Sequence, residues 1–383
     1  MIGGGSNPVD DLGAFKMPNR REDDAVPVPS TGPVTAAKVA ARAGLSRATV
    51  THVLNGRAAE MQIRPETQQR VLEAARELGY RANALARSVR TGKSGMIGYI
   101  VDDEHYEPYW HTLVGAMAEA EKEGFTLKVL SATSETFAER IRQCMELRLE
   151  GLLLRVVLDK RPLYEEANRA GMPVVTVDEW VAQPYGIRVS ADDAVGCCEA
   201  LTHLLDLGHS RIAFISSGFE SQPTEGILAR EGLFLREMDN RGLPVPKGYV
   251  SRERMEVYGR GANVVHDAST CVAATASLLD HPAGRPTAIF CWRDEAALVA
   301  IQACQRRGLR VPDDISIVGF SDLSAAWLSS PPLTTCASPW GEMGQTAMRE
   351  LVKGLKEGFD PSPREIQIPS GLIIRESTGM PHG

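Results

Sequence analysis

Apolar, strand-like runs alternate with helical stretches from Gly95 almost to the end of the chain. The runs MIGYIV, GLLLRVV, PVVTVDE, RIAFIS, TAIFCW and ISIVGFS are apolar along most of their length, as strands buried on both faces are. Repeated strand–helix–strand units predict parallel sheets covered by helices on both faces. Roughly 280 residues of this pattern are too many for one small sheet. We therefore expect two similar α/β lobes with a cleft between them.

Residues that follow the strands are candidate ligand contacts, because ligands of such sheets bind beyond the carboxyl ends of the strands. Tyr109 and Trp110 follow the first strand. Arg230 opens the helix after RIAFIS, and Asp294 follows TAIFCW. The aromatic pair could instead pack in the core, Arg230 could form a surface salt bridge, and Asp294 could cap its helix. The expected helices cover residues 109–123, 137–148, 163–170, 193–207, 229–240, 270–279 and 294–307.

The stretch between Pro33 and Gly92 is basic, although the whole chain has a formal net charge of −7. This stretch holds ten Lys and Arg and four Glu, a local net charge of +6. One basic module in an acidic chain indicates contact with a polyanion such as nucleic acid. A solvated helical surface would carry the same charge, so charge alone leaves both interpretations open.

Two short helices are expected at the start of this basic module. Thr35 is a good N-cap for the first helix, and Gly44 ends it in a tight turn. Ser46 caps the second helix, Arg47–Leu54, which the following Asn-Gly pair stops. Two short helices joined by a Gly-containing turn form a helix-turn-helix, whose second helix enters the major groove of DNA.

The polar face of the second helix supplies the candidate base contacts. Arg47 and Ala48 lie near its start, and Thr51 and His52 lie one turn later on the same side. Arginine suits the O6 and N7 acceptors of guanine, and histidine can donate to or accept from a base edge. Arg47 could instead be a surface charge, and His52 could be a helix-packing residue.

The rest of the basic module is predicted to contain a third helix and a segment that folds only when it packs against a partner or on DNA. A third helix is expected over 65–78, with Pro65 at its first position and Gly79 just past its end. The hinge and linker, residues 82–94, contain a possible helix of about ten residues, too short to be stable alone in water. Residues 33–81 are then an all-α helix-turn-helix headpiece, and residues 1–32 a disordered tail without periodicity.

The segments LSRATVTHVLNG, PETQQRVLEAARELGY and NALARSVR resemble the headpiece and hinge of the LacI/GalR family of transcriptional regulators. The resemblance implies base reading by Arg47, Ala48 and His52. It also implies that Val89 is the wedge that the hinge helix inserts into the minor groove, with Arg90 beside it. Val89 stands where the family usually has Leu, and Arg64 replaces the usual Ser or Thr cap of the third helix. Thr51, Asn55 and Arg57 complete the set of expected DNA contacts.

The segments ALTHLLDLGHSRIAFIS, LRVPDDISIVGFSD, PPLTT and IIRES extend the resemblance to a periplasmic-binding-protein-like effector domain, residues 95–383. Three chain crossovers between its lobes are expected near Asp178, Asp322 and Gly358. The N-lobe then comprises about 95–177 and 322–357, and the C-lobe about 178–321 and 358–377. The resemblance places effector contacts at Tyr109 or Trp110, Arg230 and Asp294, to which we add Asp178 and Asp322 at the crossovers.

Enzyme-like fragments in the chain do not complete a catalytic or cofactor motif. TGKS at 91–94 lacks the first Gly of a phosphate loop, and GRGANV at 259–264 lacks the third Gly of a dinucleotide fingerprint. DDEH at 102–105 has no second His at helical metal spacing, and no G-x-S-x-G occurs. We expect no enzymatic activity, no cofactor and no metal.

Cysteine usage and the N-terminus indicate a cytoplasmic protein. The seven cysteines are scattered without a C-x-x-C, which suits thiols in a reducing compartment. Neither a signal peptide nor an apolar run of about 20 residues is visible, so no membrane is expected.

The function expected from the sequence is sequence-specific transcriptional regulation, most simply repression, by a homodimer on near-palindromic operator DNA. A small molecule, a sugar or sugar derivative, would control it allosterically. Two alternatives are a solute-capture protein, which predicts a signal peptide and no headpiece, and a sugar-active α/β enzyme, which predicts paired catalytic carboxylates or a cofactor loop.

Overall fold

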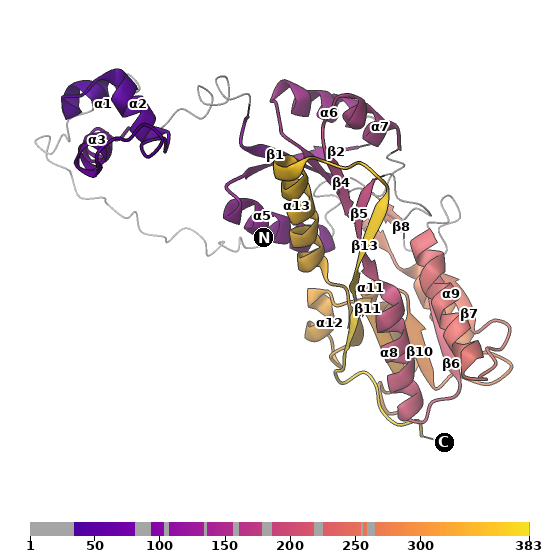
Figure 1. The fold of residues 1–383 in the computed structure, drawn as a ribbon. Coiled ribbons are helices and arrows are strands. Elements are labelled where there is room, and N and C mark those ends of the chain that lie inside the picture. The colour runs from indigo at the N-terminus through magenta and orange to yellow at the C-terminus, as the bar shows by residue number, and fades with distance from the viewer. Residues whose placement is uncertain are drawn as a thin grey trace, which may run out of the picture. The chain divides into compact units, whose positions relative to one another are not determined.

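The computed structural model describes residues 34–80, 93–102, 107–133, 136–155, 161–177, 186–217, 225–253, 256–258 and 265–382 (Figure 1). The chain divides into two compact units, Met1–Ala84 and Leu85–Gly383, and the boundary falls within the expected hinge segment. The expected tail (1–32) lies outside the described residues, as does the hinge up to residue 92.

The headpiece consists of α1 (Ala36–Ala43), α2 (Arg47–Leu54) and α3 (Pro65–Glu77). The expected caps are confirmed, because Thr35 and Ser46 each accept a hydrogen bond from a backbone amide of the helix that follows. Gly44 adopts a left-handed conformation with φ 64°, which lets the chain turn sharply into α2. The arrangement is the expected helix-turn-helix followed by a third helix.

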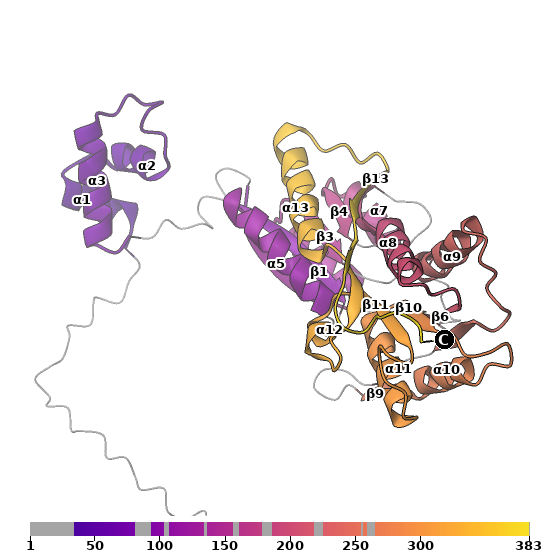
Figure 2. The ribbon, with the colours of Figure 1, turned by 90° about the horizontal axis from the view of Figure 1, so that it is seen from below.

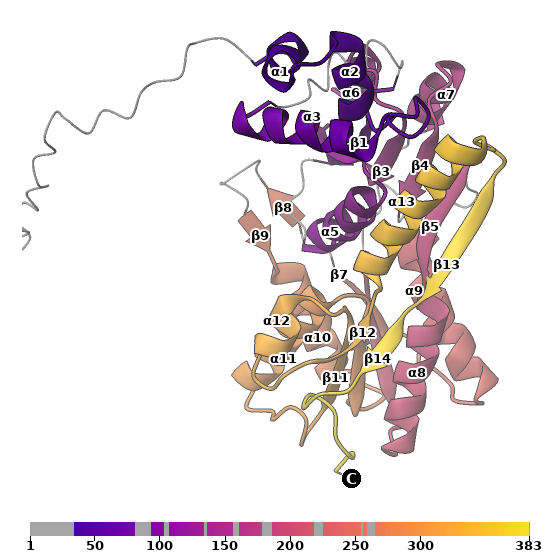
Figure 3. The same cartoon turned by 60° about the vertical axis from the view of Figure 1, so that its left-hand side comes forward.

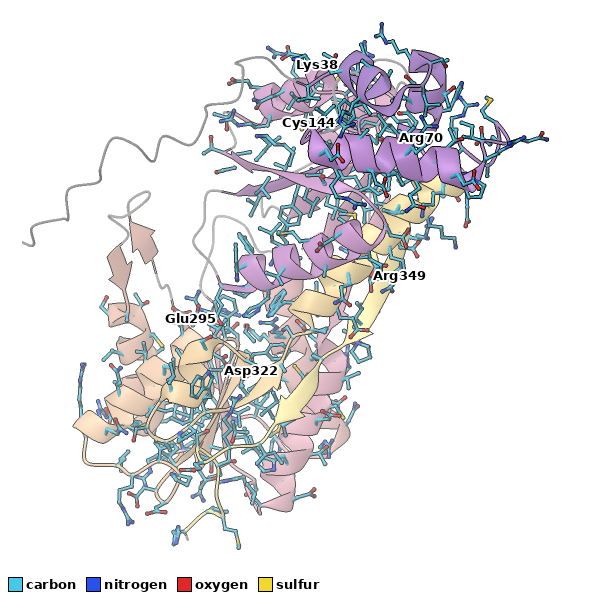
Figure 4. All side chains as sticks on the ribbon, turned by 90° about the vertical axis from the view of Figure 1, so that its left-hand side faces the viewer. Lys38, Arg70, Cys144, Glu295, Asp322 and Arg349 are labelled. Atoms are coloured by element: carbon cyan, nitrogen blue, oxygen red, sulfur yellow. The ribbon has the colours of Figure 1, made fainter. Side chains whose placement is uncertain are left out.

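Small apolar residues hold the three helices together. Val39, Val50 and Val71, one from each helix, are fully buried in a common core. Arg70, labelled in Figure 4, adds a polar tie, since its guanidinium donates to the Ala43 carbonyl at 2.7 Å. The last carbonyls of a helix lack intrahelical partners, so this bond satisfies one of them and fixes α3 against the end of α1.

The N-lobe of the effector domain contains a six-stranded sheet in which every neighbouring pair is parallel. Its strands are β1 (Met96–Asp102), β2 (Thr126–Ala132), β3 (Leu152–Arg155), β4 (Val174–Val177), β5 (Ile187–Asp192) and β13 (Arg364–Pro369). Their order is β13-β5-β4-β3-β1-β2. The helices of this lobe are α5 (Glu107–Lys122), α6 (Phe137–Glu146), α7 (Arg161–Arg169) and α13 (Trp340–Glu357).

The C-lobe contains a second six-stranded sheet, parallel except for its last pair, β12 with β14. Its strands are β6 (Ile212–Ser217), β7 (Val250–Glu253), β10 (Ala288–Cys291), β11 (Ser316–Ser321), β12 (Thr334–Ala337) and β14 (Gly371–Ile373), in the order β14-β12-β11-β10-β6-β7. Its helices are α8 (Asp193–Asp206), α9 (Glu225–Asn240), α10 (Ser269–Leu279), α11 (Asp294–Arg306) and α12 (Ser324–Leu328). A separate antiparallel pair joins β8 (Glu256–Tyr258) and β9 (Val265–Asp267).

Helices cover both faces of each sheet, as the apolar strands predict. Ile97 and Tyr99 of β1 face the core beneath α5 and α13, whereas Ile100 faces the core beneath α6 and α7. In the C-lobe, Figure 2 shows α10 and α11 on one side of the sheet and α8 and α9 on the other. The expected fold of two lobes with parallel sheets is therefore confirmed.

The chain crosses between the lobes at three places, and none lies where the sequence predicted it. The crossovers expected near Asp178, Asp322 and Gly358 are wrong. They follow β5, β12 and β13 instead, because β5 and β13 belong to the N-lobe sheet while β12 and β14 belong to the C-lobe sheet. The lobe boundaries 177/178, 321/322 and 357/358 are corrected accordingly.

Strand β5 was missed because polar residues interrupt its apolar pattern. Arg188 and Ser190 are buried within it, and both bind Glu365 of β13, at 2.8 Å and 2.5 Å. A long-range carboxylate thus compensates a buried guanidinium, which a single strand's sequence cannot reveal.

Two of the crossovers are hydrogen-bonded to each other. The Ser370 hydroxyl donates to the Asp192 carbonyl at 2.8 Å and accepts from the Gly196 amide at 3.1 Å. The connections from β5 to α8 and from β13 to β14 are therefore held together where they leave the N-lobe.

Close contact between α5 and α13 depends on glycine, which yields a first prediction. A Cβ on Gly344 would collide with the Thr112 carbonyl and crowd the Ala116 amide. We expect Gly344→Ala to destabilise the protein by about 1–3 kcal/mol, measured by chemical denaturation, because backbone cannot yield as a side-chain tip can. Gly232→Ala is the matched control: this exposed glycine of α9 has open space around it, so alanine should preserve or raise stability. Equal effects of the two substitutions would contradict the packing argument.

Candidate DNA-reading helix and effector site

The polar face of α2 is presented to solvent as the sequence predicts. Arg47 and Ala48 are exposed, and Thr51 and His52 are half-buried. Val50 and Val53, on the opposite face, are buried in the headpiece core. The helix therefore presents Arg47, Ala48, Thr51 and His52 as one accessible strip whose orientation is fixed by packing.

Three of the predicted DNA contacts, Thr51, Asn55 and Arg57, are engaged within the headpiece. The Thr51 hydroxyl donates to the Arg47 carbonyl at 2.7 Å, and the Asn55 side-chain amide donates to the Thr51 carbonyl. Arg57 pairs with Glu60 at 2.7 Å on the loop that precedes α3, and both side chains are largely exposed. A DNA phosphate would have to compete with Glu60 for Arg57. Val89 and Arg90 lie outside the described residues.

In the effector domain, the carboxyl ends of strands from both sheets meet. Arg155 ends β3 and is almost fully buried. Its guanidinium lies 4.2 Å from the centre of the Tyr109 ring and 5.5 Å from that of Trp340. Tyr109 is buried at the start of α5, and Trp340 begins α13 just after β12. The predicted aromatic residue Tyr109 thus packs on a cation at this junction.

Arg230 is buried at the carboxyl end of the C-lobe sheet. Its Nε donates to Asp193 and one Nη donates to the Trp292 carbonyl, both at 2.7 Å. Its guanidinium also lies 3.8 Å from the centre of the Phe320 ring. The helix that carries it begins at Glu225, so the prediction that Arg230 opens this helix is wrong by about one turn. The alternative considered from the sequence was a surface salt bridge of Arg230. Arg230 does form a salt bridge, with Asp193, but this salt bridge is buried.

Asp294 is fully buried at the start of α11, and its oxygens accept from two different segments. Oδ2 accepts from the Leu323 amide at 2.7 Å, and Oδ1 accepts from the Thr335 hydroxyl at 2.5 Å. Burial raises the pKa of Asp294 to about 7, although both hydrogen bonds act to lower it. The close approach is possible because Gly319 of β11 has no Cβ to collide with Oδ1.

A network around Glu253 was not predicted from the sequence. Glu253 ends β7 and is fully buried. Its Oε1 accepts from the Trp292 indole at 2.8 Å and from Arg293 at 3.2 Å. The only sequence signal was an acidic residue at the end of a short run, YVSRE, within a region that matches the family poorly.

The structure does not bring the other predicted effector residues into this cluster. Trp110 is 62% exposed, because consecutive residues of a helix point in different directions and Tyr109 takes the inward one. Asp322, labelled in Figure 4, pairs with Arg375 of the C-terminal segment at 2.6 Å. Asp178 lies outside the described residues.

A clasp between the lobes lies beside Asp294. The Ser324 amide donates to the Glu107 carboxylate at 3.0 Å and 3.1 Å, and the Ser324 hydroxyl donates to it at 2.6 Å. Burial acts to raise the pKa of Glu107, but bonds from Ser324 and His111 outweigh it and lower the pKa. Figure 3 shows the two helices that carry these residues, with α5 above α12. Leu323, bound to Asp294, is the residue next to Ser324, so the candidate site and the clasp are contiguous.

Comparison with known proteins decides the family. Residues 35–83 match the family described as bacterial regulatory proteins, lacI family, and residues 201–378 match the periplasmic binding protein-like domain. Catabolite control protein A of Priestia megaterium is 30% identical over 348 residues, covering 90% of this chain and 99% of that protein. The chain belongs to the LacI family of bacterial regulatory proteins. It is a transcriptional regulator with a DNA-binding headpiece and an effector domain.

Other relatives agree with this assignment to the LacI family. The transcriptional repressor PurR of Vibrio parahaemolyticus is 28% identical over 343 residues, covering 88% of this chain and 97% of that protein. The structure of the Lac repressor dimer bound to operator and the anti-inducer ONPF matches with a TM-score of 0.74 at 23% identity, covering 91% of this chain and all of that one. The complex of the regulator CelR with cellobiose matches with a TM-score of 0.63 at 25% identity, covering 90% and 99%.

Within the part of the chain that the structure describes, no group of three or more His, Cys, Asp or Glu side chains could hold a metal ion. No helix in that part is long and apolar enough to cross a membrane.

Proposed function

We propose that this LacI-family regulator is a repressor that binds near-palindromic operator DNA as a homodimer. The observation that carries the proposal is the exposed strip of α2, held by a packed apolar face opposite it. Each headpiece would place this helix in the major groove of one half-site, with Arg47 near a base edge. The structural neighbour named as a Lac repressor dimer bound to operator supports this arrangement.

An exposed apolar face supports dimerisation through α5 and α12. Exposed apolar patches of this kind mark protein interfaces, and the clasp between Glu107 and Ser324 places the two helices together. We assign a second copy of the chain as the occupant, because the Lac repressor neighbour is a dimer and covers 91% of this chain. The exposed apolar side chains of this dimer face are Trp110, Val114 and Met117 of α5 and Trp327 and Leu328 of α12.

The effector is proposed to be a sugar or sugar derivative that binds where the strand ends of both lobes meet. Aromatic rings and paired charges at one junction suit a ligand with an apolar face and polar edges. Tyr109, Trp340, Arg230 and Asp294 provide these groups. The neighbouring regulator CelR in complex with cellobiose supports the sugar class.

Control of DNA binding requires that the effector bind two arrangements of the lobes with different affinity, and coupling of about 1–3 kcal/mol is typical. The segment Leu323–Ser324 is suited to transmit such a difference. Its first amide is held by Asp294, and its second binds Glu107 of the other lobe next to the proposed dimer face. A ligand that displaces Asp294 from Leu323 would also disturb the clasp.

The proposal is tested by gel-shift titration of the purified protein on the promoter beside its own gene at several salt concentrations. Specific binding should weaken steeply as salt rises, because phosphate contacts release counterions. The absence of a specific shift on any nearby palindrome would refute the repressor assignment. Neutral sugars added to the binding reaction then test effector control.

A second prediction concerns Arg47. Arg47→Ala should cost about 1–3 kcal/mol on the operator and relax the preference at one base pair, because a bidentate contact to guanine is lost. Arg57→Ala is the comparison variant, since a phosphate contact should weaken binding equally on operator and random DNA. Competition gel shifts with single-position operator libraries distinguish the two patterns. A uniform loss for Arg47→Ala would make Arg47 a phosphate contact instead.

A further inference from the structure

Buried carboxylate oxygens of Glu231, Glu253 and Glu295 in the C-lobe accept no hydrogen bond among the described residues, and that of Glu253 lies in the network around Trp292. Glu253 is fully buried, and its Oε1 accepts from both Trp292 and Arg293. Its Oε2 is enclosed and accepts no hydrogen bond. A buried charged acceptor without a donor is costly, so the native protein is expected to supply one when it functions.

Glu253 belongs to the same network as the candidate effector residues. It holds the Trp292 indole and Arg293, whose guanidinium lies 4.4 Å from the centre of the Trp292 ring. The Trp292 carbonyl accepts from Arg230, and Asp294 is the residue that follows Arg293. Glu253, at the end of β7, therefore holds the segment 292–294 in place. Of the candidate effector contacts, Arg230 binds this segment and Asp294 belongs to it.

The charges of this network favour a ligand that donates hydrogen bonds. Both guanidiniums of this network form ion pairs, Arg230 with Asp193 at 2.7 Å and Arg293 with Glu253 at 3.2 Å. Among the described residues, one atom of each member of the second pair is buried without a partner, the acceptor Oε2 of Glu253 and the donor Nε of Arg293. The carboxylate oxygen attracts a hydroxyl or ammonium hydrogen and repels an anion, and a hydroxyl can also accept from Nε of Arg293.

We propose that Glu253 is a specificity-determining residue of the effector site, and the inference rests on the proposed effector site at this junction. Its Oε2 accepts a hydrogen bond from a hydroxyl or ammonium group of the effector. The site therefore selects neutral or amino sugars and rejects sugar acids and sugar phosphates.

Glu253→Gln isolates this role. The amide keeps the shape of the side chain and one acceptor oxygen for Trp292, but it places N–H hydrogens where the effector would donate. The amide no longer neutralises the largely buried Arg293, so a loss of stability is expected and is measured by urea denaturation of the ligand-free protein. An unchanged ligand affinity in the folded Glu253→Gln protein would show that Glu253 is structural and would overturn the proposal.

Ligand selectivity is measured by thermal shift on the full-length protein with glucose, cellobiose, glucosamine, gluconate and glucose 6-phosphate at matched concentrations. A neutral or amino sugar should raise Tm, and gluconate and glucose 6-phosphate should not. Comparison of glucose with glucosamine tells a hydroxyl donor from an ammonium donor. Glu253→Gln should weaken the best ligand at least tenfold, whereas Glu365→Gln, which alters an ion pair of β13 in the N-lobe, should leave its affinity unchanged.

The failure of this inference differs from the failure of the proposed function. A preference for gluconate or glucose 6-phosphate, no shift from any neutral or amino sugar, or an unchanged affinity in Glu253→Gln would each overturn the role of Glu253. Arg155 would then be the anchor for an acid. Specific operator binding by the wild type would still stand in those cases, and only its loss would refute the repressor assignment.

Discussion

Replacing Trp110 with glutamate should convert the proposed dimer into monomers and sharply weaken operator binding. Trp110 is 62% exposed on α5, and Val114 and Met117 extend the same face. Aromatic residues dominate interface energetics, and a buried unpaired carboxylate is costly. In a monomer, binding of one headpiece no longer raises the effective concentration of a second headpiece at the other half-site. Affinity for the full operator should therefore fall about 10²- to 10⁴-fold.

Analytical ultracentrifugation and gel shifts on full and half operator sites measure this effect. Trp110→Glu should bind a half-site as well as the wild-type headpiece does, because α2 lies in the other compact unit. Met380→Glu is the control, since Met380 is 73% exposed near the C-terminus and outside the dimer face. A Trp110→Glu protein that sediments as a dimer would contradict the proposed interface. Trp327→Glu on α12 should reproduce the monomer if the face spans both lobes.

The headpiece was predictable from sequence because its signals are local. Thr35, Gly44 and Ser46 act on residues within one turn, and the structure shows each in the expected capping role. The accessible strip of α2 was predictable for the same reason, since the burial of Val50 and Val53 leaves the residues on the opposite face of α2 towards solvent.

The lobe boundaries were not predictable because the crossovers depend on pairing between distant strands. Every strand–helix unit resembles the next in sequence, so nothing local shows that β5 pairs with β13 rather than with the C-lobe sheet. The buried Arg188 interrupts the apolar pattern by which β5 could have been recognised as a strand. Its partner Glu365 comes from a segment far along the chain, so the sequence around β5 does not show why an arginine can be buried there.

The candidate site was predicted only in part, for a related reason. Arg230 and Asp294 follow recognisable apolar strands, so their position at strand ends could be inferred. Glu253 is the last residue of the short strand β7, and the conspicuous core residue near it, Tyr249, comes just before that strand. Its role emerges from Trp292 and Arg293, which are distant in sequence and adjacent only after β7 and β10 flank β6.

The buried carboxyl of Asp294 should make stability depend on pH. Its pKa is raised from the usual 3.8 to about 7, chiefly by burial. The folded protein therefore binds a proton that the unfolded chain has released between these two values. This group's favourable contribution is complete below about pH 4 and is lost as pH rises through about 7. Other carboxylates whose pKa is lowered, such as Glu107, act in the opposite direction, so the effect must be isolated by substitution.

Asp294→Asn should remove this dependence, because the amide is neutral at every pH and its oxygen still accepts from the Leu323 amide. A shift of about three pKa units corresponds to roughly 4 kcal/mol. Relative to wild type, the variant should gain up to about that amount in unfolding free energy between pH 4 and pH 8. Urea denaturation across this range measures the difference, with Asp280→Asn, an exposed carboxylate paired with Arg307, as the control that keeps the wild-type profile. Parallel stability curves for Asp294→Asn and wild type would show that Asp294 stays charged when buried, stabilised by Leu323 and Thr335 alone.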